Sequence, residues 1–215
     1  MTLPRSPNHG ERRGGAVPSL IVLHYTALPD LATARAWLCD AAREVSAHWL
    51  LAEDGSAEAL VGEARRAWHA GAGGWRGITD VNSASIGIEM QNSGKSPYPE
   101  PQMAGLERLL RAIMQRWSIP PENVIAHSDL APTRKRDPGA RFDWRRLALQ
   151  GLSVWPDLPG DPDAPFEPSL TAIGYPEAPA EARLAAFRLR FRPHAHGPET
   201  PQDCAIADAL TRLRH

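Results

Sequence analysis

The sequence predicts an α/β protein with a central mixed β-sheet flanked by helices, followed by a small three-helix domain. Short apolar runs alternate with amphipathic helical patterns as far as Trp155, where a proline-rich segment begins. A length of 215 residues suits one domain of about 150 residues and a small appendage. The expected parts are a flexible N-terminal arm at 1–17, a principal domain at 18–155, a linker at 156–168 and a helical domain at 169–215.

Strands are expected where short apolar runs are bounded by turn residues. The run from Leu20 to Leu23 is continuously apolar, as in a strand that is buried on both faces. Asp54-Gly55 separates two further runs and is typical of a β-hairpin turn. The predicted strands are 20–23, 48–51, 58–61, 85–90 and 123–126.

Helices are expected where apolar residues recur every three or four positions. Asp30 fits the N-cap of a helix whose apolar spacing continues to Val45. A long helix is expected after Pro99 and Pro101 and before Pro120-Pro121. We interpret its apolar face as core, formed by Met103, Leu106, Leu109, Leu110, Ile113, Met114 and Trp117. The remaining predicted helices are 142–149, 170–174, 181–191 and 205–213.

Composition and charge narrow the function classes. A net charge of -1 argues against a nucleic-acid partner bound by bulk electrostatics. Cys39 and Cys204 are too few and too far apart for a disulfide framework. No apolar stretch suits a membrane span, and the first twenty residues lack the apolar core of a signal peptide. We therefore expect a cytoplasmic protein without a membrane partner.

Two histidines and an aspartate are candidates for a metal site. His24 and His127 each follow an apolar strand, and Asp137 returns through a turn with Pro138 and Gly139. Two histidines and a carboxylate, with a fourth position left for water, form a common zinc site in hydrolases. The alternative is structural, because a histidine at a strand end is more often only hydrogen-bonded and an aspartate before Pro-Gly commonly forms a turn.

Two further charged residues stand out, and each also has a structural interpretation. Glu89 lies inside the apolar run 85–90, where a buried carboxylate is costly unless it is paired or functional. Lys135 belongs to the run Arg134-Lys135-Arg136, which usually forms a solvated face. His48 is interpreted as a structural residue and not as a ligand.

Six motifs, taken in order, resemble the zinc-dependent N-acetylmuramoyl-L-alanine amidases of the type 2 family, which are related to peptidoglycan recognition proteins and phage amidases. The similarity covers residues 18–150. The motifs are Leu23-His24-Tyr25-Thr26-Ala27, Ala67-Trp68-His69-Ala70-Gly71, Trp75-Arg76-Gly77, Ser85-Ile86-Gly87-Ile88-Glu89, Ala126-His127-Ser128-Asp129 and Lys135-Arg136-Asp137-Pro138-Gly139.

This resemblance implies that residues 18–155 are a zinc amidase catalytic domain. It makes His24, His127 and Asp137 the ligands of one Zn²⁺ per chain. The bond cleaved would join the lactyl group of N-acetylmuramic acid to L-alanine, so peptidoglycan fragments (muropeptides) would be the partners. No protein partner is implied.

The resemblance also implies roles for four other side chains. Glu89 would act as the general base, Lys135 would stabilise the oxyanion, and Trp68 and His69 would bind substrate. One departure is Ala47, because many relatives carry a tyrosine there. That tyrosine's contribution is therefore missing here, whereas the expected reaction is unchanged.

The tail is similar to the peptidoglycan-binding domain of the AmiD-like branch of these amidases. The similarity rests on residues 172–175 and 185–193, and a plain helical cap is the alternative. We expect a recycling enzyme acting on 1,6-anhydro-muropeptides in the cytoplasm. The alternatives are a periplasmic amidase acting on intact peptidoglycan and a non-catalytic muropeptide-binding module, although such binders typically lack part of the zinc set.

Overall fold

The structure is a computed structural model that describes residues 5–213. Its centre is a five-stranded sheet with the strand order β4-β3-β6-β2-β7 across those residues. The strands are β2 (Leu20–Tyr25), β3 (Trp49–Leu51), β4 (Ala57–Ala59), β6 (Ser85–Met90) and β7 (Val124–Ala126). The chain order and the sheet order differ because β2 pairs with two strands that come much later in the sequence.

The sheet is mixed, as the sequence predicts. β2 runs parallel to β6 and β7, β3 runs parallel to β6, and β4 is antiparallel to β3. The β2 residues from Leu20 to Leu23 are at most 1% exposed, because other elements cover both faces of this central strand. The parallel arrangement places the C-terminal ends of β2, β6 and β7 at one edge of the sheet.

Helices cover the sheet through the predicted apolar faces. Leu106 and Leu110 of α3 (Glu100–Trp117) pack with Ile86 and Ile88 of β6 in one buried cluster. α1 (Leu31–Leu38) and α5 (Trp144–Leu149) confirm two other predicted helices with shorter bounds. The short helical segments are η1 (Arg13–Gly15), η2 (Ala41–Arg43), α2 (Val81–Ala84), η3 (Pro121–Asn123) and α4 (His127–Leu130).

The prediction that the first helix continues to Val45 is wrong. The Asp30 side chain caps α1 as predicted, by accepting a hydrogen bond from the Thr33 amide. The helix ends at Leu38, and the Asp40 side chain caps η2 instead. Apolar spacing alone missed this end because Asp40 offers the backbone a competing cap.

Residues 5–17 are not the loose arm that their composition indicates. β1 (His9–Gly10) pairs antiparallel with β5 (Arg66–Ala67). Buried Ser6 donates a hydrogen bond to the Leu38 carbonyl, and the Asn8 amide donates to two further main-chain carbonyls. Such side-chain bonds leave no trace in apolar periodicity. Residues 1–4 of the expected arm and 214–215 of the expected helical domain lie outside the described residues.

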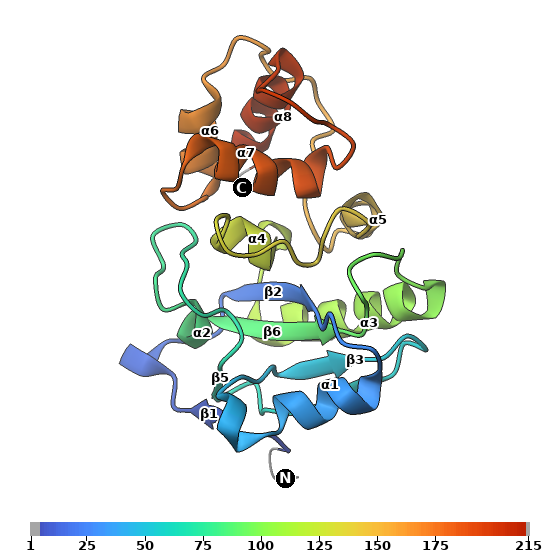
Figure 1. The fold of residues 1–215 in the computed structure, drawn as a ribbon. Coiled ribbons are helices and arrows are strands. Elements are labelled where there is room, and N and C mark those ends of the chain that lie inside the picture. Colours follow the sequence, from blue (N-terminus) through green and yellow to red (C-terminus); the bar gives the residue numbers. More distant parts are fainter. Residues whose placement is uncertain (1–4, 214–215) are drawn as a thin grey trace.

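Between residues 160 and 213 the chain forms three helices, as predicted. They are α6 (Phe166–Ile173), α7 (Ala180–Phe191) and α8 (Pro201–Thr211). α6 begins inside the segment expected to be a linker, because Pro168 occupies its first turn, where a missing backbone N–H costs nothing. Figure 1 shows these helices stacked on the side of α4 and α5 that faces away from the sheet.

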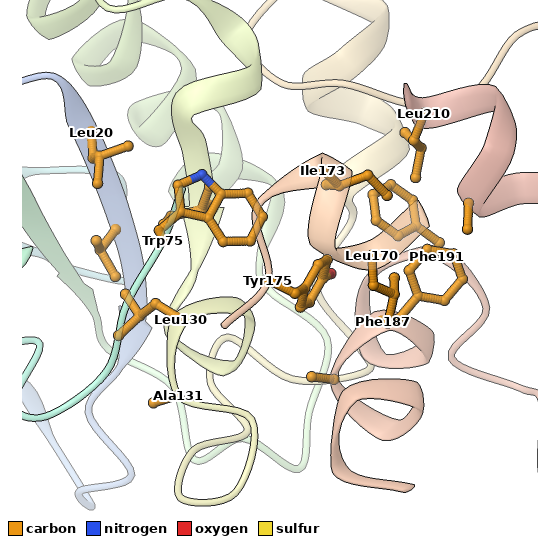
Figure 2. Packing of buried hydrophobic residues seen from close by; sticks show 14 of the residues in the cluster. Leu20, Trp75, Leu130, Ala131, Leu170, Ile173, Tyr175, Phe187, Phe191 and Leu210 are labelled. Carbon is orange, nitrogen blue, oxygen red and sulfur yellow. The ribbon is translucent and has the colours of Figure 1, made fainter. Parts of the chain in front are cut away.

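The tail shares a hydrophobic core with the sheet domain. Figure 2 shows Trp75 and Leu130 between Leu20 of β2 and the tail residues Tyr175 and Phe187. The same cluster also contains Phe166, Leu170, Ile173, Phe191 and Leu210 from the tail. The composition change at Trp155 therefore marks a connection between two packed layers. Within residues 5–213, no helix has both the length and the apolar character needed to cross a membrane.

Candidate metal and hydrolytic site

Three side chains converge at the C-terminal edge of the parallel strands. His24 Nδ1 lies 2.8 Å from His127 Nδ1 and 2.9 Å from Asp137 Oδ2, and His127 Nδ1 lies 2.9 Å from the same oxygen. His24 is 1%, His127 3% and Asp137 7% exposed. The sequence predicts these same three residues as metal ligands. Each offers one ligand atom, and together the three atoms could hold a metal ion.

The sheet register explains why the two histidines meet. Leu23 of β2 aligns with Ala126 of β7, so the next residue of each strand is a histidine at the same edge of the sheet. α4 begins at His127 and turns the chain away. The main-chain oxygen of Asp137 accepts a hydrogen bond of 3.1 Å from the Ser128 amide, which returns the loop to the histidines.

A hydrogen bond fixes the orientation of the His127 ring. His127 Nε2 lies 2.9 Å from the Ala70 carbonyl oxygen, which can only accept, so Nε2 carries the ring proton of the neutral imidazole. Nδ1 therefore presents a lone pair toward His24 and Asp137. A carbonyl partner on the far nitrogen is the usual support of a metal-bound histidine.

The geometry and chemistry of this donor set fit zinc. Zn²⁺ binds nitrogen and oxygen at about 2.0 Å. Because His24 Nδ1, His127 Nδ1 and Asp137 Oδ2 are separated by 2.8 to 2.9 Å, one ion can lie at about that distance from all three atoms. Burial, and then the neighbouring His127, lower the pKa of His24 to about 4 and keep the ring neutral, as a ligand must be. The contacts with both histidines hold the pKa of Asp137 below its ordinary value despite burial, so it is ionised.

Glu89 stands beside this triangle on the neighbouring strand. The register of β2 and β6 pairs His24 with Glu89. The side chain is partly exposed, yet its Oε2 atom is buried and has no hydrogen-bond partner among residues 5–213. Burial, reinforced by the Asp137 charge and opposed by Lys135, raises the pKa of Glu89 to about 8. An unpaired buried carboxyl beside a ligand cluster is a candidate acid or base.

An open cavity of about 600 Å³ lies next to the candidate metal site. Its lining includes the predicted residues Trp68, His69, Glu89, Lys135 and two of the three proposed ligands, His127 and Asp137. The Lys135 ammonium is close enough to lower the pKa of both His24 and Glu89. The cavity therefore combines a proton acceptor and a cation beside a candidate metal site.

Both ring nitrogens of His69 have partners within the protein, which the sequence does not reveal. Its Nδ1 lies 3.0 Å from His24 Nε2, and its Nε2 lies 3.2 Å from Ser85 Oγ. The ring rests against Gly87, where a Cβ atom would lie 2.4 Å from the His69 Cγ atom. Burial, and then the neighbouring His24, lower the pKa of His69 well below its ordinary value.

His48 is a structural residue, as predicted. Its Nδ1 accepts a hydrogen bond of 2.9 Å from the Gly87 amide, and its Nε2 lies 3.0 Å from the Arg65 carbonyl oxygen. Burial is the main reason that the pKa of His48 falls to about 3. His48 therefore connects the start of β3 to β6 through Nδ1 and to the segment before β5 through Nε2. Ala47, the departure noted in the sequence, is fully buried.

Sequence reasoning missed several residues that line the cavity. Trp37 on α1 is 39% exposed at the cavity, with the Arg43 guanidinium 3.2 Å from the centroid of its ring. A tryptophan on the polar side of a short helix is the signal that could have found it. Arg134 also lines the cavity, and its Nη2 donates to the Ala70 carbonyl.

Comparisons with known proteins agree with this geometry. Residues 14–140 match the family described as N-acetylmuramoyl-L-alanine amidase. The N-acetylmuramoyl-L-alanine amidase AmiD of Escherichia coli is 39% identical over 89% of this chain and 81% of its own. The 1,6-anhydro-N-acetylmuramyl-L-alanine amidase AmpD of Enterobacter cloacae is 32% identical over 66% of this chain and 85% of its own.

Solved structures extend the similarity to the tail. The complex of AmiD from E. coli with anhydro-N-acetylmuramic acid-L-Ala-D-gamma-Glu-L-Lys has a TM-score of 0.82 at 34% identity, covering 94% of this chain and 96% of that one. AMPDH3 from Pseudomonas aeruginosa has a TM-score of 0.81 at 30% identity, covering 98% and 97%. The chain therefore belongs to the N-acetylmuramoyl-L-alanine amidase family of hydrolases.

Proposed function

We propose that this amidase is zinc-dependent and cleaves the bond between 1,6-anhydro-N-acetylmuramic acid and L-alanine of a peptidoglycan stem peptide. The observation that carries the proposal is the convergence of His24, His127 and Asp137 beside Glu89 at one open cavity. One Zn²⁺ per chain would be held by the first three. A non-catalytic muropeptide-binding module is disfavoured because the ligand set and the unpaired carboxyl occur together.

A zinc ion bound at this site would polarise the amide carbonyl and would lower the pKa of a water molecule to about 7. His24, His127 and Asp137 would hold the ion next to the cavity that His127 and Asp137 line. The buried ligands, at most 7% exposed, limit competition from bulk water. Asp137 contributes the one negative charge among the ligands.

Glu89 and Lys135 are the proposed catalytic residues. In its ionised form, which a cation bound nearby would favour, Glu89 takes a proton from the attacking water and passes it to the leaving nitrogen of L-alanine. Its buried Oε2 has no competing partner among the described side chains and main-chain groups. Lys135 lines the same cavity, and its ammonium stabilises negative charge that develops on the carbonyl oxygen.

Trp68 and His69 are the proposed substrate-binding residues. Both line the cavity, and the Trp68 amide donates a hydrogen bond of 2.8 Å to Ser46 Oγ, which fixes the main chain of the wall. The Trp68 indole offers a flat apolar surface for a sugar or peptide. The two ring nitrogens of His69 already have partners, so substrate would meet the face of its ring.

The proposed substrate is a soluble 1,6-anhydro-muropeptide, and the proposed role is cell-wall recycling in the cytoplasm. Support comes from similar proteins: AmpD is named for the 1,6-anhydro substrate, and AmiD was solved with an anhydro-muropeptide. A periplasmic amidase acting on intact peptidoglycan is the alternative. The two differ in which substrate is cleaved fastest.

Mass spectrometry of the products tests the reaction and its substrate. The zinc-loaded protein should release the intact stem peptide from an anhydro-muramyl tripeptide and should cleave this fragment faster than intact sacculi. Faster cleavage of sacculi would favour a periplasmic amidase that acts on intact peptidoglycan. If neither substrate is cleaved, the protein would be a non-catalytic muropeptide-binding module.

Fractionation of the native cells tests the compartment separately. The recycling role predicts the protein in the cytoplasmic fraction. Recovery from the periplasm would contradict this role, although the amidase reaction would be unaffected.

A further inference from the structure

We infer that His69 and Ser85 are positioning residues, which set the His24 tautomer so that Nδ1 presents its lone pair to the metal site. Three hydrogen bonds in series connect a main-chain carbonyl to His24. They join Val81 O to Ser85 Oγ, Ser85 Oγ to His69 Nε2, and His69 Nδ1 to His24 Nε2. The inference rests on the proposed role of His24 as a zinc ligand.

The direction of the series is fixed at its far end. Ser85 Oγ lies 2.5 Å from the Val81 carbonyl oxygen, and a carbonyl oxygen has no proton to give. The single hydroxyl proton of Ser85 therefore points at Val81. Ser85 Oγ can then only accept from its other neighbour, His69 Nε2 at 3.2 Å. Ser85 is fully buried, so water does not compete for this position.

The proton positions then follow one by one to the ligand. A neutral imidazole has one N–H, and in His69 it lies on Nε2, so Nδ1 is an acceptor. His24 Nε2, 3.0 Å away, must donate to that acceptor. His24 Nδ1 is left without a proton, facing His127 Nδ1 and Asp137 Oδ2. A metal ion bonds only the unprotonated nitrogen, so this tautomer prepares the site.

The position of the His69 ring is itself enforced by the fold. Gly87 leaves room for the ring, because any larger residue would place a Cβ atom within 2.4 Å of it. The buried Asn82 carboxamide oxygen accepts hydrogen bonds from the His69 and Ala70 amides, at 3.0 and 2.8 Å. The same Ala70 supplies the carbonyl that orients His127. One short segment thus orients both histidines of the site.

The variant Ser85→Ala tests this inference because Ser85 does not line the cavity and cannot touch substrate. It leaves His69 Nε2–H without an acceptor, so His69 no longer has a single preferred tautomer. We expect zinc to bind about 10- to 100-fold more weakly, as for the loss of other groups that support metal ligands. Zinc affinity is measured by competition with a chromophoric chelator.

Ser169→Ala is the matched control. Ser169 is also a buried serine that donates to a main-chain carbonyl, Pro165 O at 2.9 Å, but it lies in α6 of the tail. Zinc affinity should be unchanged in this variant. An equal loss in both variants, or no loss in Ser85→Ala, would overturn the inference.

Long-range ¹H–¹⁵N NMR of the zinc-free wild-type protein reads the tautomers directly and does not depend on any variant folding. We expect His24 and His69 to carry their protons on Nε2. A His24 proton on Nδ1 would overturn the inference even if zinc binds tightly. A His24 proton on Nε2 would support the inference whether or not zinc binds. Failure of the wild-type protein to bind zinc would contradict the proposed function and not the tautomer.

Discussion

The Glu89 side chain is the residue on which the proposed chemistry depends most. Glu89→Gln keeps the size of the side chain but removes its ability to accept a proton, so turnover should fall about 10²- to 10⁴-fold. Zinc content should remain one per chain, because Glu89 is not among the three converging ligands. Glu53→Gln, at an exposed position, is the control. Near-normal turnover of Glu89→Gln would remove Glu89 from the role of base.

The raised pKa of Glu89 also predicts how the stability of the zinc-free protein depends on pH. Burial raises the pKa of Glu89 to about 8 in the folded state, from 4.5, so the folded state holds a proton that the unfolded chain releases. The stabilising contribution is complete below pH 4.5 and is lost as the pH rises through about 8.

Urea denaturation of the zinc-free protein at a series of pH values measures this effect. Between pH 4.5 and 8, the wild type should lose on the order of a few kcal/mol of unfolding free energy relative to Glu89→Gln. Parallel pH profiles for the two proteins would show that the Glu89 carboxyl is not perturbed.

Apolar strands and helical stripes were predictable from sequence, whereas polar contacts were not. His24 and His127 could be placed at strand ends because the runs before them are uniformly apolar, and the register of β2 and β7 then brings them together. Asp40 caps η2 just after the end of α1, and Asn8 anchors the N-terminal segment through main-chain carbonyls. Hydrogen bonds of that kind depend on neighbours that periodicity does not identify.

The element that links the tail to the site is α4, which begins at His127. Asp129, fully buried in α4, accepts hydrogen bonds from the Tyr175 hydroxyl and the Arg190 guanidinium, each at 2.8 Å. It also accepts one from the Ala126 amide, at the start of the helix. The tail therefore completes the hydrogen bonding of the segment that carries a proposed ligand.

Arg190→Met should lower the unfolding free energy by about 3 to 5 kcal/mol, because it leaves the Asp129 charge buried without its cation. Chemical denaturation measures the change. Arg212→Met is the control, since Arg212 pairs with Asp208 at an exposed position and should matter little. A loss below about 1 kcal/mol in Arg190→Met would show that the ion pair does not tie the tail to α4.

At the scale of the whole molecule, the tail is joined to the sheet domain by a common core. Trp75 and Leu130 of the sheet domain pack in the same cluster as Tyr175 and Phe187 (Figure 2). The boundaries 18–155, 156–168 and 169–215 remain a proposal, as does the peptidoglycan-binding role of the tail. The aromatic residues that give the tail its core are not free to meet a ligand.

Sedimentation with intact sacculi tests whether the tail binds the wall. The full-length Glu89→Gln protein is used so that the sacculi are not cut, and excess soluble anhydro-muropeptide blocks the cavity. Cosedimentation that persists under this block would support a binding domain. Its complete loss would support the alternative of a plain helical cap.

Metal removal and restoration test the central claim most directly. The measurement is release of stem peptide from an anhydro-muramyl tripeptide by the purified protein, by the protein after chelation, and after one equivalent of Zn²⁺ is returned. In the wild type, activity should disappear on chelation and return with zinc. In Asp137→Ala, added zinc should not produce activity, because the variant lacks one of the three converging ligands. Full activity in protein shown by elemental analysis to contain no metal would contradict the account.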